Sequence, residues 1–242
     1  MQAVILAGGL GTRLRPITHQ ITKPMVPVAG KPYLEHQLRL LRQQSITDVI
    51  MLVGYLGYQI EDYFADGCRF GLTVRYSHEE SPLGTGGALR EARRLLDQRF
   101  LLIYGDSYLP TDYGAPMQRL GASAAKGVIV LYDNRLEDTS VTSNIAVDSA
   151  GYVTRYEKDR PSDLELQYVD AGVLALDRSI LALMPSDGIV SLETELFPKL
   201  ITQRQLVSHI VTQRFYDIGS PERLRLFEEF LRHDYHPDSF SH

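Results

Sequence analysis

A glycine loop with basic side chains directly follows the first apolar run of the chain. The stretch AGGLGTRLRP, residues 7–16, contains three glycines and two arginines, and Lys23 follows soon after. Glycines leave backbone amides accessible, and amide, guanidinium and ammonium groups all bind phosphate. The first acidic residue of the chain is Glu35. This pattern predicts a site for a small, phosphate-rich ligand.

Two familiar glycine motifs do not fit this loop. A P-loop requires Gly, four residues and then Gly-Lys-Ser/Thr, which the chain lacks. The dinucleotide fingerprint requires a third glycine where Leu14 stands. A phosphate-binding loop and a tight turn with surface arginines remain. Lys23 favours the phosphate-binding loop over the tight turn, because nearby prolines would hold its ammonium group in a fixed place. These prolines are Pro16, Pro24 and Pro27.

The loop must be positioned by the elements around it. In the first half of the chain, short apolar runs alternate with segments of helical period, which predicts βα units on a mainly parallel sheet. Strands are expected at residues 3–7, 48–54, 72–77, 99–106 and 127–133, and helices from Pro32 and at 58–64 and 86–96. The loop then lies at the carboxyl end of the first strand, where open α/β sheets bind ligands.

The second half has a more antiparallel pattern. Residues 144–159 predict two strands around a turn at 149–151, and 168–177 predict another strand. A helix is expected from Ser220, with Pro221 at its first position. We therefore expect an α/β fold with a Rossmann-like mixed sheet, whose N-terminal half is parallel. One domain would cover residues 1–232, with a polar tail at 233–242.

Composition excludes several classes of protein. The net charge of -5 opposes binding to a nucleic-acid polymer, which requires a basic face. The first apolar run is too short to span a membrane and does not resemble a signal peptide, so we expect a cytoplasmic protein without a membrane partner. A homo-oligomer is compatible with this composition. The single cysteine, Cys68, excludes a Cys-rich zinc site and is interpreted as a small, buried or half-buried apolar residue.

Six motifs, in this order, resemble those of the sugar-1-phosphate nucleotidylyltransferases. They are GGLGTRLRPIT, TKPM, PLGTGGA, YGDS, EKDRP and FYDIG. The resemblance extends to about Arg232 and implies the fold of nucleotide-diphospho-sugar transferases. It also implies that a sugar 1-phosphate oxygen attacks the α-phosphate of a nucleoside triphosphate and that pyrophosphate leaves. Such a reaction needs mainly positioning and charge neutralisation.

The resemblance assigns roles to residues of these motifs. Arg13 would stabilise the leaving pyrophosphate, and Lys23 would contact the reacting phosphates. The nucleotide would be held by Leu6, Gly8, Gly9, Gly11, Glu79 and Gly84. Asp106 and Asp217 would bind Mg²⁺, a cation that prefers carboxylate oxygens and retained waters. Taken alone, each aspartate also fits an ordinary turn or loop residue.

Glu79 is informative about the base. Relatives selective for uracil or thymine typically have glutamine at this position. An ionised carboxylate only accepts hydrogen bonds, which suits N1–H and the amino group of guanine and predicts GTP. Glu80, or backbone groups near Gly84, are alternative readers of the base.

On the sugar side, the resemblance implies that Glu157 contacts hydroxyl groups and Lys158 the sugar phosphate. Asp170 stands where the family usually has asparagine, and an ionised carboxylate there could accept but not donate. The closest resemblance is to the heptose 1-phosphate guanylyltransferases of surface-polysaccharide synthesis, with D-glycero-D-manno-heptose 1-phosphate as the expected acceptor. Alternatives are a UTP- or dTTP-dependent enzyme for a hexose or aminosugar 1-phosphate, and a non-catalytic relative that binds a nucleotide sugar.

Overall fold

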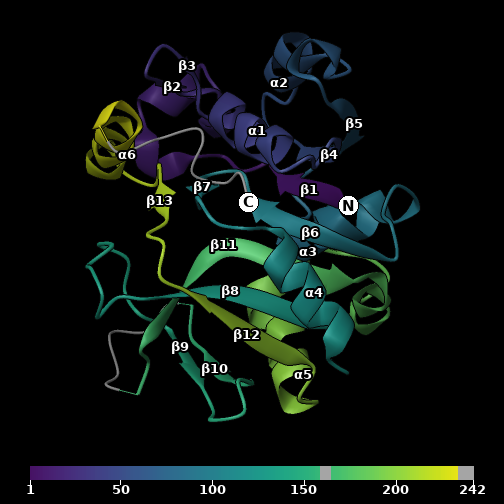
Figure 1. Cartoon of the computed structure of the whole chain (residues 1–242). Helices are drawn as coiled ribbons and strands as arrows, with labels where there is room; N and C mark the ends of the chain where they lie inside the picture. Colours follow the sequence, from purple (N-terminus) through teal and green to yellow (C-terminus); the bar gives the residue numbers. More distant parts are fainter. Residues whose placement is uncertain (159–164, 234–242) are drawn as a thin grey trace.

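The computed structural model describes residues 1–158 and 165–233 (Figure 1). Within these residues, nine strands form one mixed sheet in which the order β10-β9-β11-β6-β1-β4-β5 is extended by β8 against β11 and β12 against β8. The strands of the parallel N-terminal half are β1 (Gln2–Leu6), β4 (Asp48–Val53), β5 (Thr73–His78) and β6 (Arg99–Tyr104). The predicted parallel N-terminal half is confirmed.

The other strands build the half of the sheet that was predicted to be more antiparallel. The strand β11 (Tyr168–Asp177) runs antiparallel to both β6 and β8 (Gly127–Asp133). The strands β9 (Ile145–Val147) and β10 (Val153–Tyr156) form the expected pair around the turn, and β12 (Leu206–Val211) runs parallel to β8. The predicted fold class, a mixed α/β sheet, is therefore confirmed.

Short elements surround the sheet. Two-residue strands pair as β2 (Pro27–Val28) with β3 (Lys31–Pro32) and β7 (Ser107–Tyr108) with β13 (Tyr216–Asp217). The α-helices are α1 (Tyr33–Gln43), α2 (Tyr58–Phe64), α3 (Gly84–Glu91), α4 (Gly114–Ala122), α5 (Phe197–Thr202) and α6 (Pro221–His233). Single turns that matter below are η1 (Thr12–Leu14), η3 (Lys23–Met25) and the π-helical η7 (Leu192–Leu196).

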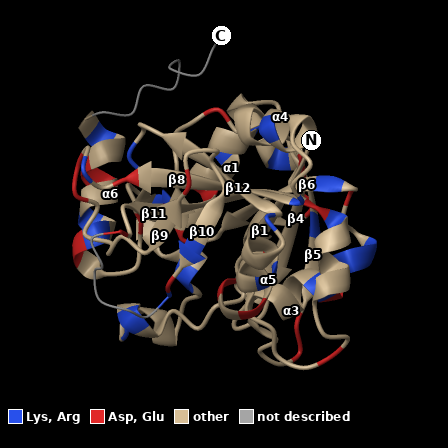
Figure 2. Cartoon of the chain, turned by 90° about the horizontal axis from the view of Figure 1, so that it is seen from below, with Lys and Arg blue, Asp and Glu red and all other residues tan. Residues whose placement is uncertain are grey.

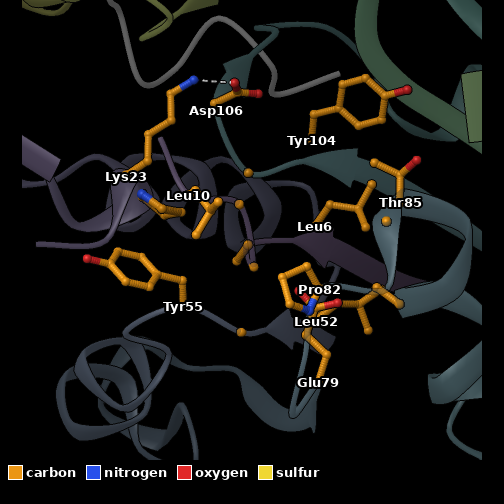
Figure 3. A pocket seen from close by; sticks show the side chains of 18 of the residues that line it. Leu6, Leu10, Lys23, Leu52, Tyr55, Glu79, Pro82, Thr85, Tyr104 and Asp106 are labelled. Carbon is orange, nitrogen blue, oxygen red and sulfur yellow. Dashed lines mark hydrogen bonds and ion pairs between the residues drawn. The ribbon is translucent and has the colours of Figure 1, made fainter. Parts of the chain in front are cut away.

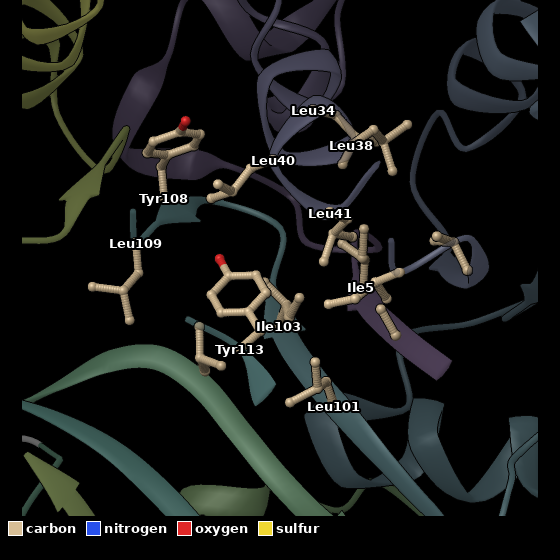
Figure 4. Packing of buried hydrophobic residues seen from close by; sticks show 14 of the residues in the cluster. Ile5, Leu34, Leu38, Leu40, Leu41, Leu101, Ile103, Tyr108, Leu109 and Tyr113 are labelled. Atoms are coloured by element: carbon tan, nitrogen blue, oxygen red, sulfur yellow. The ribbon is translucent and has the colours of Figure 1, made fainter. Parts of the chain in front are cut away.

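Helices cover both faces of the parallel strands, which explains their continuous apolar sequences. Successive side chains of a strand point to opposite faces. Ile5 of β1 therefore belongs to the core that contains Leu34 and Leu38 of α1 (Figure 4), whereas Val4 belongs to the core that contains Leu89 of α3 and Phe197 of α5. This packing holds the strands in place, and hence the loops that follow their ends.

Several sequence predictions need correction. The strand expected over 99–106 ends at Tyr104, so Asp106 lies in a turn and not in the strand. The helix expected over 86–96 begins at Gly84 and is α-helical only to Glu91. Cys68 is exposed, which contradicts the prediction of a buried or half-buried residue.

The structure leaves some predictions partly or wholly untested. The polar tail falls on residues outside the described part, apart from His233, which is the last residue of α6. The single domain over 1–232 stays a prediction.

In the described ranges, none of the helices combines the length and the apolar character that crossing a membrane would require. Figure 2 shows basic and acidic side chains interspersed on α6 and around β5.

Candidate active site

A cavity of about 600 Å³ opens at the carboxyl ends of β1, β4 and β6 (Figure 3). Parallel strands end together at this edge, so loops that are distant in sequence meet there. Seven of the predicted site residues line it: Leu6, Gly8, Gly9, Lys23, Glu79, Gly84 and Asp106. Glu79 lies at one end of the cavity, and Lys23 and Asp106 lie at the other.

Lys23 and Asp106 form an ion pair within the cavity. Their Nζ and Oδ2 atoms are 2.5 Å apart, and the Lys23 side chain is only 11% exposed. Burial alone would raise the pKa of Asp106, but the charge and hydrogen bond of Lys23, with the charge of Arg13, outweigh it and lower that pKa. Asp106 is therefore ionised and faces the region where a phosphate-rich ligand would lie.

Asp217 reaches the same turn from the other end of the chain. In the antiparallel pair of β13 and β7, Asp217 is opposite Ser107, and the Ile218 amide donates to the Asp106 carbonyl at 3.2 Å. Arg223 of α6 donates to Asp217 Oδ2 at 2.7 Å. Burial raises the pKa of Asp217 although Arg223 opposes this effect. Asp217 does not itself line the cavity.

The two aspartates fit the requirements of Mg²⁺. This cation takes hard oxygen ligands and is commonly bound by one or two carboxylates while it retains waters. Asp106, in the turn before β7, and Asp217, in the paired strand β13, supply the carboxylates, and the charge of Asp106 contributes to the raised pKa of Asp217. The described part of the chain contains no group of three or more His, Cys, Asp or Glu side chains that could hold a metal.

Arg13 and Gly11 lie beside the cavity and do not line it. Arg13 is on η1 and exposed, yet its positive charge contributes to the lowered pKa of Asp106. Gly11 packs against the stem of Lys23: a Cβ added there would lie 3.1 Å from Lys23 Cβ. The turn before η1 therefore supports the lysine.

Gln37 of α1 holds the turn that carries Asp106, a feature that the sequence did not reveal. Its Nε2 atom donates to the Tyr104 carbonyl at 2.8 Å and to the Ser107 carbonyl at 2.5 Å. These carbonyls flank Asp106 on both sides. Gln37 is only 3% exposed, so packing fixes its side-chain amide, and the amide in turn positions the turn that carries Asp106.

Glu79 lies against two glycines at the other end of the cavity. A Cβ at Gly8 would come within 2.6 Å of Glu79 Oε1, and one at Gly54 within 2.5 Å, so only glycine leaves room for the carboxylate. Glu79 Oε2 accepts from the Leu83 amide at 3.1 Å. Burial raises the pKa of Glu79, while the hydrogen bond from Leu83 opposes this effect. Glu79 lines the cavity in this position.

The predicted sugar-side residues lie near a further acid, Glu193 of η7. Lys158 Nζ is 3.4 Å from Glu193 Oε2, and Glu193 lines the cavity although it is only 7% exposed. Asp170 of β11 accepts from the Gly172 amide at 2.8 Å and from the Tyr156 hydroxyl at 3.4 Å.

Glu157 does not line the cavity and pairs with Arg155 at 3.5 Å. Residues 159–161 of the EKDRP motif lie outside the described residues.

Glu193 was missed by the sequence reasoning. Its carboxylate accepts from Ser191 Oγ at 2.7 Å, Thr85 Oγ1 at 2.9 Å and Tyr104 Oη at 3.3 Å. Burial raises its pKa, but the hydrogen bonds and Lys158 outweigh burial and lower it. A signal was present in SLETELFPKL, because helical spacing places Glu193 on the face of Leu196 and Leu200. An acid on an apolar face indicates a buried polar contact.

Comparison with known proteins gives one family. The family model "Nucleotidyl transferase" matches residues 2–233. The chain is 30% identical to D-glycero-alpha-D-manno-heptose 1-phosphate guanylyltransferase of Aneurinibacillus thermoaerophilus, over 96% of this chain and 99% of that protein. It is 31% identical to UTP--glucose-1-phosphate uridylyltransferase of Synechocystis, over 83% of this chain but only 55% of that protein's length.

A solved structure agrees with these sequence matches. The crystal structure of HddC from Yersinia pseudotuberculosis complexed with GMP-PN superposes with a TM-score of 0.78 at 28% identity. The superposition covers 95% of this chain and 99% of HddC. The likeness therefore extends over nearly the whole of both chains.

Proposed function

Because the chain belongs to the nucleotidyl transferase family, we propose that it transfers GMP from GTP to a sugar 1-phosphate and releases pyrophosphate. We propose D-glycero-D-manno-heptose 1-phosphate as the acceptor. One observation carries this proposal: a single cavity contains the glycine loop, the Lys23–Asp106 pair and Glu79. Similarity to a heptose 1-phosphate guanylyltransferase over nearly the whole of both chains supports the choice of base and sugar.

The reacting phosphates would lie at the end of the cavity that holds Lys23. A phosphate oxygen of the sugar 1-phosphate attacks the α-phosphorus of GTP, the bond to the bridging oxygen breaks, and its electron pair leaves with pyrophosphate. The amides of Gly8 and Gly9 would hold the triphosphate, and Lys23 would neutralise charge on the reacting phosphates. Arg13, on the outer side of the loop, would stabilise the leaving pyrophosphate.

We propose that Asp106 and Asp217 hold Mg²⁺ during this reaction. When bound, the cation would neutralise charge between the two phosphate groups that must approach each other. Lys23 keeps Asp106 ionised, and Arg223 opposes the effect of burial on Asp217. Asp106 is therefore already in the ionised form that a hard cation requires.

Glu79 would select the base. Guanine presents N1–H and an amino group on one edge, and a carboxylate can accept from both. In uracil and thymine, O4 is an acceptor and would face the same carboxylate without a donor. The hydrogen bond from Leu83 fixes Glu79 Oε2, so the carboxylate keeps its orientation when a base enters.

We also propose that the product serves surface-polysaccharide synthesis. Both substrates carry phosphate charges that keep them inside the cell, so the reaction would take place in the cytoplasm.

Pyrophosphate release tests this function. GTP, UTP, dTTP, CTP and ATP would each be assayed with Mg²⁺ against a panel of heptose and hexose 1-phosphates. Release restricted to GTP with a heptose 1-phosphate is expected. Release with UTP and a glucose-type phosphate would retain the enzyme class, reject Glu79 as a guanine reader and favour the function of the Synechocystis relative.

A lysine variant makes the assay specific for this cavity. Lys23→Met should lose nearly all turnover, because no other side chain of the cavity lining carries a positive charge in the described structure. Lys126→Met is the matched control, since Lys126 precedes β8 and does not line the cavity. Equal turnover in both variants would contradict the proposed site.

A further inference from the structure

Gln59 of α2 holds the backbone that leads into Lys23. Its Oε1 atom accepts from the Thr22 amide at 2.9 Å, and its Nε2 atom donates to the Gln20 carbonyl at 2.8 Å. These two backbone groups belong to the residues on either side of Ile21. One side-chain amide therefore satisfies both a donor and an acceptor of this segment and fastens the segment to α2.

The backbone of Thr22 determines the place from which the Lys23 side chain extends. Thr22 is the N-cap of η3 and only 1% exposed, and its carbonyl accepts from the Met25 amide at 2.9 Å. Pro24 is buried directly after the lysine and restricts the backbone there. Because the main chain is fixed on both sides of Lys23, its ammonium group reaches Asp106 from a constrained starting point.

The helix α2 is itself fixed by the hydrophobic core. Ile60 and Phe64 of this helix are 0% and 1% exposed, and they belong to the same core as Val53 of β4. Gln59 is half-buried and directly precedes Ile60. Close packing resists displacement of such a helix, so the two hydrogen bonds of Gln59 hold the segment against a rigid element.

The stretch from Gly11 to Lys23 is also closed within itself. Thr18 is only 1% exposed, and its Oγ1 atom donates to the Gly11 carbonyl at 2.7 Å. The Tyr55 hydroxyl, from the turn before α2, donates to the His19 carbonyl at 3.3 Å. The stretch therefore has an internal bond at Thr18, while α2 and the turn before it hold the part that adjoins Lys23.

We propose that Gln59 is a positioning residue for Lys23: its two hydrogen bonds to residues 20–22 set where the ammonium group meets the reacting phosphates. This role rests on the proposed function, in which Lys23 neutralises phosphate charge. A misplacement of about 1 Å can slow an enzyme on the order of 100-fold. The effect should fall on kcat, because a charge that acts mainly in the transition state changes KM little.

Gln44 makes the same pattern of hydrogen bonds in another part of the chain. Just after the end of α1, its Nε2 atom donates to the Thr111 carbonyl and its Oε1 atom accepts from the Tyr113 amide, both at 2.8 Å. Gln44 and Gln59 are both half-buried, and in the described structure neither Gln44 nor residues 111–113 line the cavity. Gln44→Met therefore removes an equivalent pair of bonds away from the proposed site and is the matched control.

Steady-state kinetics of Gln59→Met tests the proposal. Methionine has a similar length and favours a helix, but it can form neither bond. With the substrates of the proposed reaction, kcat should fall about tenfold while both KM values stay within about twofold of wild type. Gln44→Met should lower Tm as much as Gln59→Met does and leave kcat within about twofold of wild type. An unchanged kcat in Gln59→Met, or equal losses of kcat in the two variants, would overturn the proposal.

Trace labelling of lysine amines gives a second test that requires no turnover. Acetic anhydride would be added in a limiting amount, and the labelling of Lys23 relative to Lys126 would be measured by mass spectrometry. Burial and the pair with Asp106 shield Lys23, so its relative labelling in wild type should be low. Gln59→Met should raise this labelling severalfold, whereas Gln44→Met should not.

Equal labelling of Lys23 in all three proteins would refute its positioning by Gln59. If no nucleotide and sugar pair reacts but the labelling rises in Gln59→Met alone, the proposed function fails while the positioning stands.

Discussion

Replacing Asp170 by asparagine should change how folding stability depends on pH. Burial, strengthened by the charge of Glu193, raises the pKa of Asp170 from 3.8 in an ordinary aspartate to about 7 in the folded chain. Between these values the folded state binds a proton that the unfolded state has released, so the free energy of unfolding falls as pH rises. The stabilising effect of this proton is complete below pH ~4 and is lost by pH ~7.

The size of the effect follows from the same two values. Each tenfold change in proton affinity corresponds to about 1.4 kcal/mol, so the full difference amounts to about 4 kcal/mol. This is an upper limit, because Asp170 is half-buried and retains some contact with solvent. From pH ~5 to pH ~7 the expected gain of Asp170→Asn over wild type is about 2–3 kcal/mol. For a chain of this size that is a difference in Tm on the order of 5–10 °C.

Urea or thermal unfolding of both proteins across this pH range measures the difference directly. Asp177→Asn is a suitable control at the other end of β11. Burial of Asp177 is outweighed by hydrogen bonds from Ser179 and Gln98, which lower its pKa, so its titration is complete below this range. Its offset from wild type should be constant. A constant offset for Asp170→Asn as well would refute the reasoning about its surroundings.

Three further substitutions test the rest of the cavity. Asp106→Asn should reduce turnover at least about 100-fold while nucleotide binding without metal persists, and full activity would remove Asp106 from the metal site. Glu79→Gln should raise the preference for UTP over GTP about tenfold, measured as the ratio of kcat/KM values; an unchanged ratio means that another group reads the base. Gln37→Leu should lower stability by about 1–3 kcal/mol and also raise the Mg²⁺ concentration needed for half-maximal activity. A loss of stability alone would limit Gln37 to a structural role.

The sequence predicted best those elements whose pattern depends only on burial. The boundaries of β8 and β11 were predicted as observed, since both are apolar runs covered on both faces. The strand expected to reach Asp106 stops at Tyr104, where the Gly105 amide donates to the Leu6 carbonyl and turns the chain. The strand β12 was not predicted, because Ser208 and His209 interrupt its apolar pattern at the edge of the sheet.

For the site, sequence position was most informative where a residue directly follows a strand. Glu79 follows β5 and the glycine loop follows β1, so the common edge of the parallel strands brings them together. Asp217 and Glu193 reach this edge through pairing with β7 and through the contact of η7 with Thr85. Such contacts depend on packing between distant segments, which spacing along one chain does not determine.

The position of β6 suits the proposal that one cavity serves two substrates. This strand lies between β1 and β11, where the parallel half of the sheet meets the antiparallel half. Its last residue, Tyr104, contacts Glu193 on the proposed sugar side, and the turn that follows carries Asp106 to Lys23 on the proposed nucleotide side. Attack on a phosphate requires the two reactants to be held at a fixed separation. We infer that the end of β6, secured by Gln37 through the carbonyls on either side of Asp106, sets that separation.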